Sequence, residues 1–185
     1  MDQQKKYEFV PGDEKAVAPG RTAKRIRALI AIAALGVAPG ELGGYIESEG
    51  NLQVSGNAWV SGDAQVSGDA RVSGNAQVYG DAQVSGNAWV SGDARVSGDA
   101  QVSGDARVES QTDWLLVGPA KSSGRFTTAY RDTKIGVRVS CGCFTGTAQE
   151  FSAQIEATHA GNQQHLQQYR LFCQLIALSF DIPPA

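Results

Sequence analysis

The chain has 185 residues, of which 42% are hydrophobic, and a formal net charge of -3 at pH 7, so we expect a soluble protein with one elongated body and a small second domain. Without an overall basic excess, the composition gives no signal for nucleic-acid binding. No apolar stretch reaches the ~20 residues that span a bilayer, and three cysteines form no complete disulfide framework, so we expect a cytoplasmic protein away from membranes.

Residues 1–41 are predicted to form an N-terminal strand or cap segment. Residues 28–39 are apolar and follow Arg25 and Arg27, but the stretch begins late for a secretory signal and is too short to cross a membrane. We expect it to be buried as a strand or a helix. The alanine-rich residues 28–34 are the part that favours a helix.

Residues 42–117 are predicted to form a β-solenoid. Valine recurs at every sixth position from Val54 to Val108, and alanine does so from Ala58 to Ala106, each alanine preceded by Gly-Asp or Gly-Asn. A six-residue period with a glycine in every cycle does not fit an α-helix. Short strands with Gly-Asp corners fit it, and identical coils must stack to bury the valines and alanines.

The repeat continues upstream in a less regular form. Leu42 falls on the valine positions, while Ile46 and Leu52 fall on the alanine positions, so we expect the solenoid to start near Leu42. The aspartates before the alanines are expected to form corners by bonding to their own backbone, with a cation held by stacked carboxylates as the alternative.

The hexapeptide Val-Ser-Gly-Asp-Ala-Gln, which begins at Val60, resembles the repeat of left-handed parallel β-helices. The resemblance implies a mainly β fold with three hexapeptides in each triangular coil, and hence nearly four coils in residues 42–108. A quadrilateral or right-handed solenoid is the alternative. The segment Gly-Gly-Tyr-Ile-Glu at residues 43–47 resembles that of hexapeptide-repeat proteins of phages and prophages, whose function is unknown.

Coils of three hexapeptides would stack outward side chains in columns. One column places Trp89 between Arg71 and Arg107, where guanidinium groups can stack on the indole ring, and another column begins with Trp59. Exposed tryptophans among arginines are typical of partner interfaces. Packing within the column explains them equally well.

Residues 118–185 are predicted to form a small α+β domain, introduced by a linker at 118–124. Strands at 125–131 and 134–143 form a hairpin around Asp132 and Thr133. A capping-box pattern starts a first helix at Thr147 that ends near His159. A second helix is apolar nearly all round, so we expect it to be covered on two sides, partly by another subunit of a homo-oligomer, for which a trimer is favoured. Its apolar residues are Leu166, Tyr169, Leu171, Phe172, Cys173, Leu175, Ile176, Leu178 and Phe180.

The cysteines are predicted to be structural. Cys141 and Cys143 share the parity of Val137 and Val139, so both are expected to face the core. A zinc site is the alternative, and its ligands would be Cys141, Cys143, His159 and Cys173.

The other strand parity suggests an anion site. The predicted hairpin places Arg125 and Arg131 on one face with Arg138 and Ser140, where three guanidinium groups could bind a phosphate. The alternative is that these arginines only solvate the outer face of a sheet.

The left-handed β-helix is also the fold of hexapeptide acyltransferases and trimeric carbonic anhydrases. Residues 42–117 contain no histidine, so neither a catalytic base nor a three-histidine metal site can be built on the repeats. We therefore expect a non-enzymatic protein without a cofactor. With the phage resemblance, its expected role is to interfere with a host defence system by blocking a host protein or sequestering a nucleotide signal, and a structural part of a virion or filament is the alternative.

Overall fold

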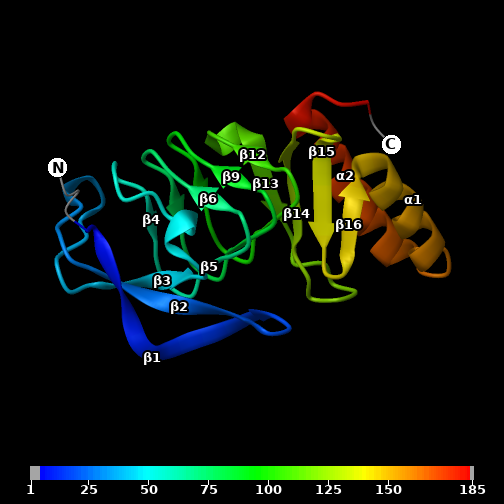
Figure 1. The fold of residues 1–185 in the computed structure, drawn as a ribbon. Coiled ribbons are helices and arrows are strands. Elements are labelled where there is room, and N and C mark those ends of the chain that lie inside the picture. Colours follow the sequence, from blue (N-terminus) through cyan, green and yellow to red (C-terminus); the bar gives the residue numbers. More distant parts are fainter. Residues whose placement is uncertain (1–4, 184–185) are drawn as a thin grey trace. The chain divides into compact units, whose positions relative to one another are not determined.

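The computed structural model describes residues 5–183. The chain divides into two compact units, Met1–Gln111 and Thr112–Ala185, each with its own sheets (Figure 1). Among the described residues, no helix has the length and apolarity needed to cross a membrane. Most of the regular structure is β, as the sequence predicts.

The first unit contains the predicted parallel β-solenoid of about four coils (Figure 1). Its first strand is β3 (Leu42–Ile46), and every later strand has two residues. The later strands are β4 (Trp59–Val60), β5 (Gln65–Val66), β6 (Arg71–Val72), β7 (Gln77–Val78), β8 (Gln83–Val84), β9 (Trp89–Val90), β10 (Arg95–Val96), β11 (Gln101–Val102) and β12 (Arg107–Val108). They stack as three parallel columns, β3-β5-β8-β11, β4-β7-β10 and β6-β9-β12, one on each side of the coil.

The solenoid follows directly from the hexapeptide. The valine and alanine side chains of the stacked coils are fully buried, from Val60 and Ala64 to Val108. The glycine of each hexapeptide has a positive φ and turns the chain at a corner. Each coil donates its N–H groups to the carbonyl groups of the next coil, as in the bond from Trp59 to Ala76 at 3.0 Å.

The first coil is longer than the later ones, which corrects the predicted register. Ile46 pairs with Val66 and Leu52 with Val72, whereas Val60 pairs with Val78. The partners in the first two pairs lie two positions further apart along the sequence than those in the third pair. Ile46 and Leu52 therefore occupy valine positions, not alanine positions. The two extra residues bulge after Leu52, which leaves Val54 outside the core.

The N-terminal segment is a β-hairpin, as the predicted strand or cap suggested. Strand β1 (Tyr7–Ala18) pairs antiparallel with β2 (Arg21–Ala28), and β2 pairs with β3 of the first coil. Between β2 and β3 only a short 3₁₀ turn, η1 (Ala33–Leu35), is helical, so the alanine-rich stretch is mostly loop and forms no α-helix. A second 3₁₀ turn, η2 (Glu49–Asn51), lies in the first coil.

Side chains from this segment close the first coil. The carbonyl groups of that coil have no preceding coil to donate to them, and unpaired backbone groups are costly when buried. Lys6, Tyr7 and Arg25 supply the missing donors. The acceptors are the carbonyl oxygens of Ala58 for Lys6 (2.8 Å), Leu52 for Tyr7 (3.1 Å) and Gly43 for Arg25 (2.9 Å).

The second unit is an antiparallel sheet with two helices on one face (Figure 1). Its strands run in the order β13 (Trp114–Val117), β14 (Thr127–Asp132), β15 (Gly136–Cys141) and β16 (Phe144–Thr147). The 3₁₀ turn η3 (Gln111–Asp113) precedes them, and α1 (Ala148–His159) and α2 (Gln163–Phe180) follow. Val139, Phe151, Leu166 and Ile176 are central to the apolar core of this unit.

Two details of the domain prediction are wrong. β13 pairs with β14 along its whole length, so residues 114–117 belong to the C-terminal sheet and not to the solenoid. Residues 118–124 connect these two paired strands, so they form a loop within the unit and not a linker between domains. The predicted start and end of the first helix are confirmed, because Thr147 and Glu150 form a capping box and α1 ends at His159.

Candidate binding pocket

The structure does not bring the three predicted arginines together. Arg131 lies opposite Val137 in the sheet and Arg138 lies opposite Tyr130, so the two guanidinium groups start from opposite faces. The prediction assumed a two-residue turn at Asp132 and Thr133, but three residues separate β14 from β15. One extra residue in a hairpin turn reverses which residues share a face.

Arg138 and Ser140 have structural partners instead. Arg138 Nε donates to Asp132 Oδ2 at 2.6 Å, and this carboxylate also accepts two backbone N–H groups. Burial raises the pKa of Asp132, but these hydrogen bonds outweigh it and hold the pKa below its ordinary value. The Ser140 hydroxyl lies 3.1 Å from that of Tyr130 and is buried.

Arg131 lies at the other end of the helix-covered face. Its Nε is 3.2 Å from Asp113 Oδ1, and its guanidinium group lies 5.7 Å from the centre of the Phe180 ring. Arg131 is therefore already paired, and only Arg125 of the predicted anion site lines a large pocket.

This pocket lies between the loop before β14, the turn between β15 and β16, and the two helices, and has a volume of about 490 Å³. Twelve residues line it: Ser122, Ser123, Arg125, Cys141, Cys143, Phe144, Phe151, Gln154, Ile155, Thr158, His159 and Tyr169. Pockets of a few hundred Å³ with mostly apolar walls and a few polar groups are typical sites for small molecules.

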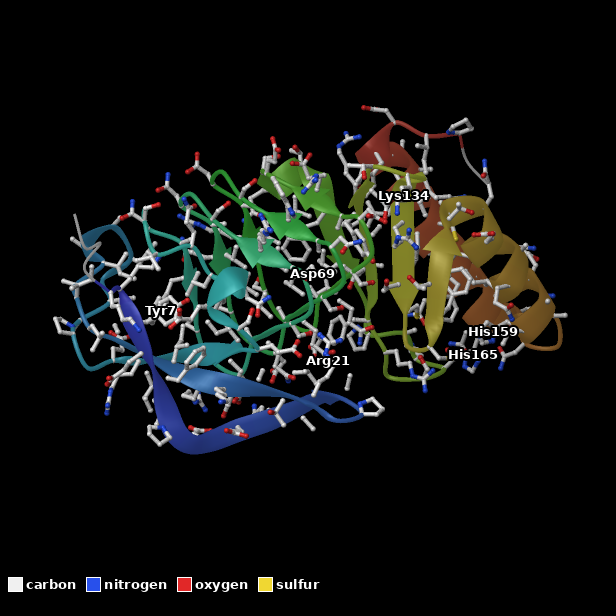
Figure 2. The ribbon with its side chains drawn as sticks, in the orientation of Figure 1. Tyr7, Arg21, Asp69, Lys134, His159 and His165 are labelled. Carbon is white, nitrogen blue, oxygen red and sulfur yellow. The ribbon has the colours of Figure 1, made fainter. Side chains whose placement is uncertain are left out.

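Aromatic rings form one wall of the pocket. His159 stacks on Tyr169 with ring centres 5.0 Å apart and planes 14° from parallel. Phe151 continues the wall, 6.2 Å from Tyr169 and 5.3 Å from Phe144. His159 and His165 lie beside each other where α1 ends and α2 begins (Figure 2). The stacked rings of His159 and Tyr169 therefore lie at the pocket close to the turn between α1 and α2.

The loop at residues 121–125 forms the polar wall. The hydroxyl groups of Ser122 and Ser123 lie 3.4 and 3.3 Å from the Tyr169 hydroxyl. The backbone N–H of Lys121 donates to Gln168 on α2 at 2.9 Å, which anchors the loop.

The Arg125 side chain is an exposed cation at this loop. It lies across Gly142, where an added Cβ would be only 2.7 Å from Arg125 Nη1. Gly142 has a φ of +60° and turns the chain between β15 and β16, so the turn leaves room for the guanidinium group. Within residues 5–183, that guanidinium group has no carboxylate or hydrogen-bond partner, although Arg131 and Arg138 both do.

The structure does not bring together the four residues of the alternative zinc site. Cys141 is partly buried against the core, but Cys143 follows the turn at Gly142 and is exposed, so the prediction that both face the core is wrong for Cys143. Both line the pocket with His159, whereas Cys173 does not, and burial raises the pKa of Cys173 to about 11. Among the described residues, no group of three His, Cys, Asp or Glu side chains is placed to hold a metal ion.

The structure forms the predicted column of Arg71, Trp89 and Arg107, but it buries the other predicted interface tryptophan, Trp59. Trp89 lies between Arg71 and Arg107, whose guanidinium groups are 5.6 and 3.9 Å from its ring, and it is 42% exposed. Trp59 is only 3% exposed, because its indole packs beside Gly43 of β3. Trp59 therefore belongs to the core and cannot contact a partner.

A hollow of about 700 Å³ lies next to the exposed tryptophan. Gln53, Val54 and Ser55 line it together with Arg71 and Trp89. It lies where the two extra residues of the first coil bulge. The later coils have no such insertion, so this hollow is specific to the start of the solenoid.

One comparison with known proteins finds a match in the repeats. The family model described as the YdcK Beta solenoid repeat matches residues 52–66, 64–80, 76–92, 82–98 and 88–104. No curated protein matches the chain. The match and the coil geometry together show a repeat-containing β-helix protein.

Proposed function

We propose that this repeat-containing β-helix protein is a non-enzymatic binding protein, and that its C-terminal unit holds a small anionic ligand with an aromatic ring, such as a nucleotide. The observation that carries the proposal is the position of Arg125, a cation without a partner among residues 5–183, at the edge of a pocket with an aromatic wall. A guanidinium group binds phosphate through two parallel hydrogen bonds, and flat bases stack on aromatic rings.

The pocket has separate places for the two parts of such a ligand. The phosphate would lie at the loop, where Arg125 and the hydroxyl groups of Ser122 and Ser123 can donate to it. The exposed ammonium group of Lys121 adds charge at the same loop. The base would lie against the wall formed by Phe144 and the stacked pair of rings. A volume of about 490 Å³ is within the range of small-molecule sites.

The resemblance of residues 43–47 to phage proteins supports a role in a host cell. A phage protein that binds a nucleotide without turning it over would lower the free concentration of a host signal. The lack of histidine in the solenoid supports binding over catalysis, because left-handed β-helix enzymes take a base or metal ligands from such residues.

Isothermal titration calorimetry with linear and cyclic nucleotides tests the proposal. Arg125→Gln should lower the affinity roughly tenfold or more, because one charge-assisted phosphate contact is lost. Arg131→Gln is the matched control, since Arg131 is also an exposed arginine of the second unit but is paired with Asp113. The proposal is wrong if the wild-type protein binds no nucleotide, or if both variants bind equally well.

The column Arg71, Trp89 and Arg107 favours a second function, the blocking of a host protein. An indole that is 42% exposed between two arginines has the composition of an interface hot spot. Trp89→Ala should then abolish retention of a host protein on the immobilised chain, while Gln83→Ala, at an exposed position on another side of the coil, should not. If neither variant loses retention of a host protein, this second function is contradicted.

Head-to-tail stacking in a filament is disfavoured, because Lys6, Tyr7 and Arg25 already occupy carbonyl groups of the first coil.

A further inference from the structure

Helix α2 carries an apolar stripe on its outer face that the described residues leave exposed. Leu171, Leu175 and Leu178 are 54%, 44% and 78% exposed. Five other large apolar side chains are exposed in the described part of the chain, but they are scattered, whereas these three lie within eight residues. Positions i, i+4 and i+7 share one helix face, so the three leucines form one surface.

Within α2 the neighbours of the leucine stripe are uncharged, and the exposed Asp181 lies just beyond the end of the helix. Gln164, Gln167 and Gln174 are exposed and lie on the same face by helical spacing. The sequence of α2 contains no Asp or Glu. Its arginine, Arg170, is bound to Glu156 of α1 by two hydrogen bonds of 2.6 and 2.7 Å. A charged partner would therefore find little opposite charge along α2. A second copy packed antiparallel would bring no like charges together, because the two copies of Asp181 would lie at opposite ends of the helix pair.

The spacing of the stripe is compatible with an antiparallel pair of helices. Leu171 and Leu178 lie equally far from a point between Gln174 and Leu175. A two-fold axis through that point would place an antiparallel second helix so that Leu171 of each copy meets Leu178 of the other. Leu175 would meet its own copy on one side of the axis, and Gln174 would meet its own copy on the other.

We propose that α2 is the interface of a two-fold dimer, in which it pairs antiparallel with α2 of a second copy through Leu171, Leu175 and Leu178. Such a contact is isologous, with the same patch used on both subunits. The Gln174 amides can hydrogen-bond to each other across the axis, and antiparallel helices place their dipoles in opposite directions. This differs from the trimer that the solenoid resemblance predicts, so mass measurements separate the two.

Light scattering over a range of protein concentrations gives the first test. The wild type should have twice the chain mass at high concentration, and Leu178→Glu should reduce it to the mass of one chain, because two carboxylates would be buried in the contact. Leu29→Glu is the matched control, since Leu29 is an exposed leucine, 41% accessible, in the first unit. A wild-type monomer, a trimer, or a dimer that survives Leu178→Glu would overturn the proposal.

Crosslinking tests the position of the axis. In a Cys143→Ser background, which removes the exposed native thiol, Leu175→Cys should form a disulfide-linked dimer under mild oxidation, because the two copies of this residue meet. Leu171→Cys alone should not, because its neighbour is Leu178 of the second copy. Equal crosslinking of both variants would overturn the antiparallel register, and circular dichroism of each variant shows whether it is folded.

A milder pair of variants tests the same surface without large changes in packing. Gln174→Glu should weaken the dimer by bringing two carboxylates together at the axis. Gln163→Glu, also exposed but at the start of α2, should leave the dimer intact. An equal dimer dissociation constant for the two variants would contradict the proposed pairing.

Discussion

Replacing a corner glycine inside the stack should destabilise the solenoid far more than replacing a glycine of the same conformation outside it. Gly86 has a φ of +68°, and a Cβ added there would lie 2.9 Å from the backbone nitrogen of Gly104 in the next coil. Gly20, in the turn between β1 and β2, has a φ of +71°, and a Cβ added there would meet no atom within 4 Å. A side chain at either position would have the same backbone strain, but only Gly86 lacks room for a Cβ atom.

The expected losses of stability come from the backbone strain and from the lack of room for a Cβ atom. An alanine with a left-handed backbone costs about 1 kcal/mol, so Gly20→Ala should lower the free energy of unfolding by about that amount. Gly86→Ala adds an overpacking cost of about 2 kcal/mol, because its neighbour is backbone and cannot rotate away. We therefore expect a total loss of about 3 kcal/mol for Gly86→Ala.

Urea titration followed by tryptophan fluorescence measures both losses. Trp59 is buried in the first unit and should report its unfolding. Both glycines lie in that unit, so the two variants probe the same transition. Equal losses would refute the reasoning, because they would mean that the coils are not in close contact at Gly86 and that only the backbone strain matters.

Three further predictions concern titratable groups. Burial lowers the pKa of Lys6 from 10.5 to about 8. Between about pH 8 and pH 10.5 the unfolded chain therefore binds a proton at Lys6 that the folded chain does not, so the first unit should gain stability as the pH rises through that range. Lys6→Met should remove this gain in urea titrations. Asp132→Asn should lower the free energy of unfolding of the second unit by about 3 kcal/mol in thermal or urea unfolding, since Arg138 would lose its buried carboxylate. Acid should destabilise the wild type more than this variant as the pH falls through the lowered pKa of Asp132. With a chromogenic disulfide reagent, Cys143 should react first and Cys173 last, and a fast phase that persists in Cys143→Ser would contradict this order.

The solenoid could be predicted because one period determines both its core and its corners. The register of the first coil could not be predicted with the same rule, because the two extra residues after Leu52 leave apolar residues in both possible registers. A clue was present: Ile46 and Leu52 are too large for the narrow alanine positions. Side-chain volume, used with the period, would have placed them at the valine positions.

The anion site shows how one residue in a turn can change a functional prediction. Counting two turn residues placed Arg131 and Arg138 on one face, and the actual three place them on opposite faces. Arg125 remained a candidate because it lines the pocket whatever the positions of Arg131 and Arg138. The pocket depends on the stacking of His159 on Tyr169 between two helices, and a single sequence gives no signal for that contact.

The coil length of three hexapeptides makes the outer surface sensitive to the number of repeats. Tandem repeats in a gene gain or lose copies by slippage, and one repeat here encodes six residues. Losing a single hexapeptide would preserve the valine core, but it would rotate every later residue to the next side of the triangle. If the lost hexapeptide lay between Trp89 and Arg107, these two side chains would no longer stack. Only changes of three repeats at a time keep the surface pattern, so selection on that surface should leave related chains that differ in length by whole coils.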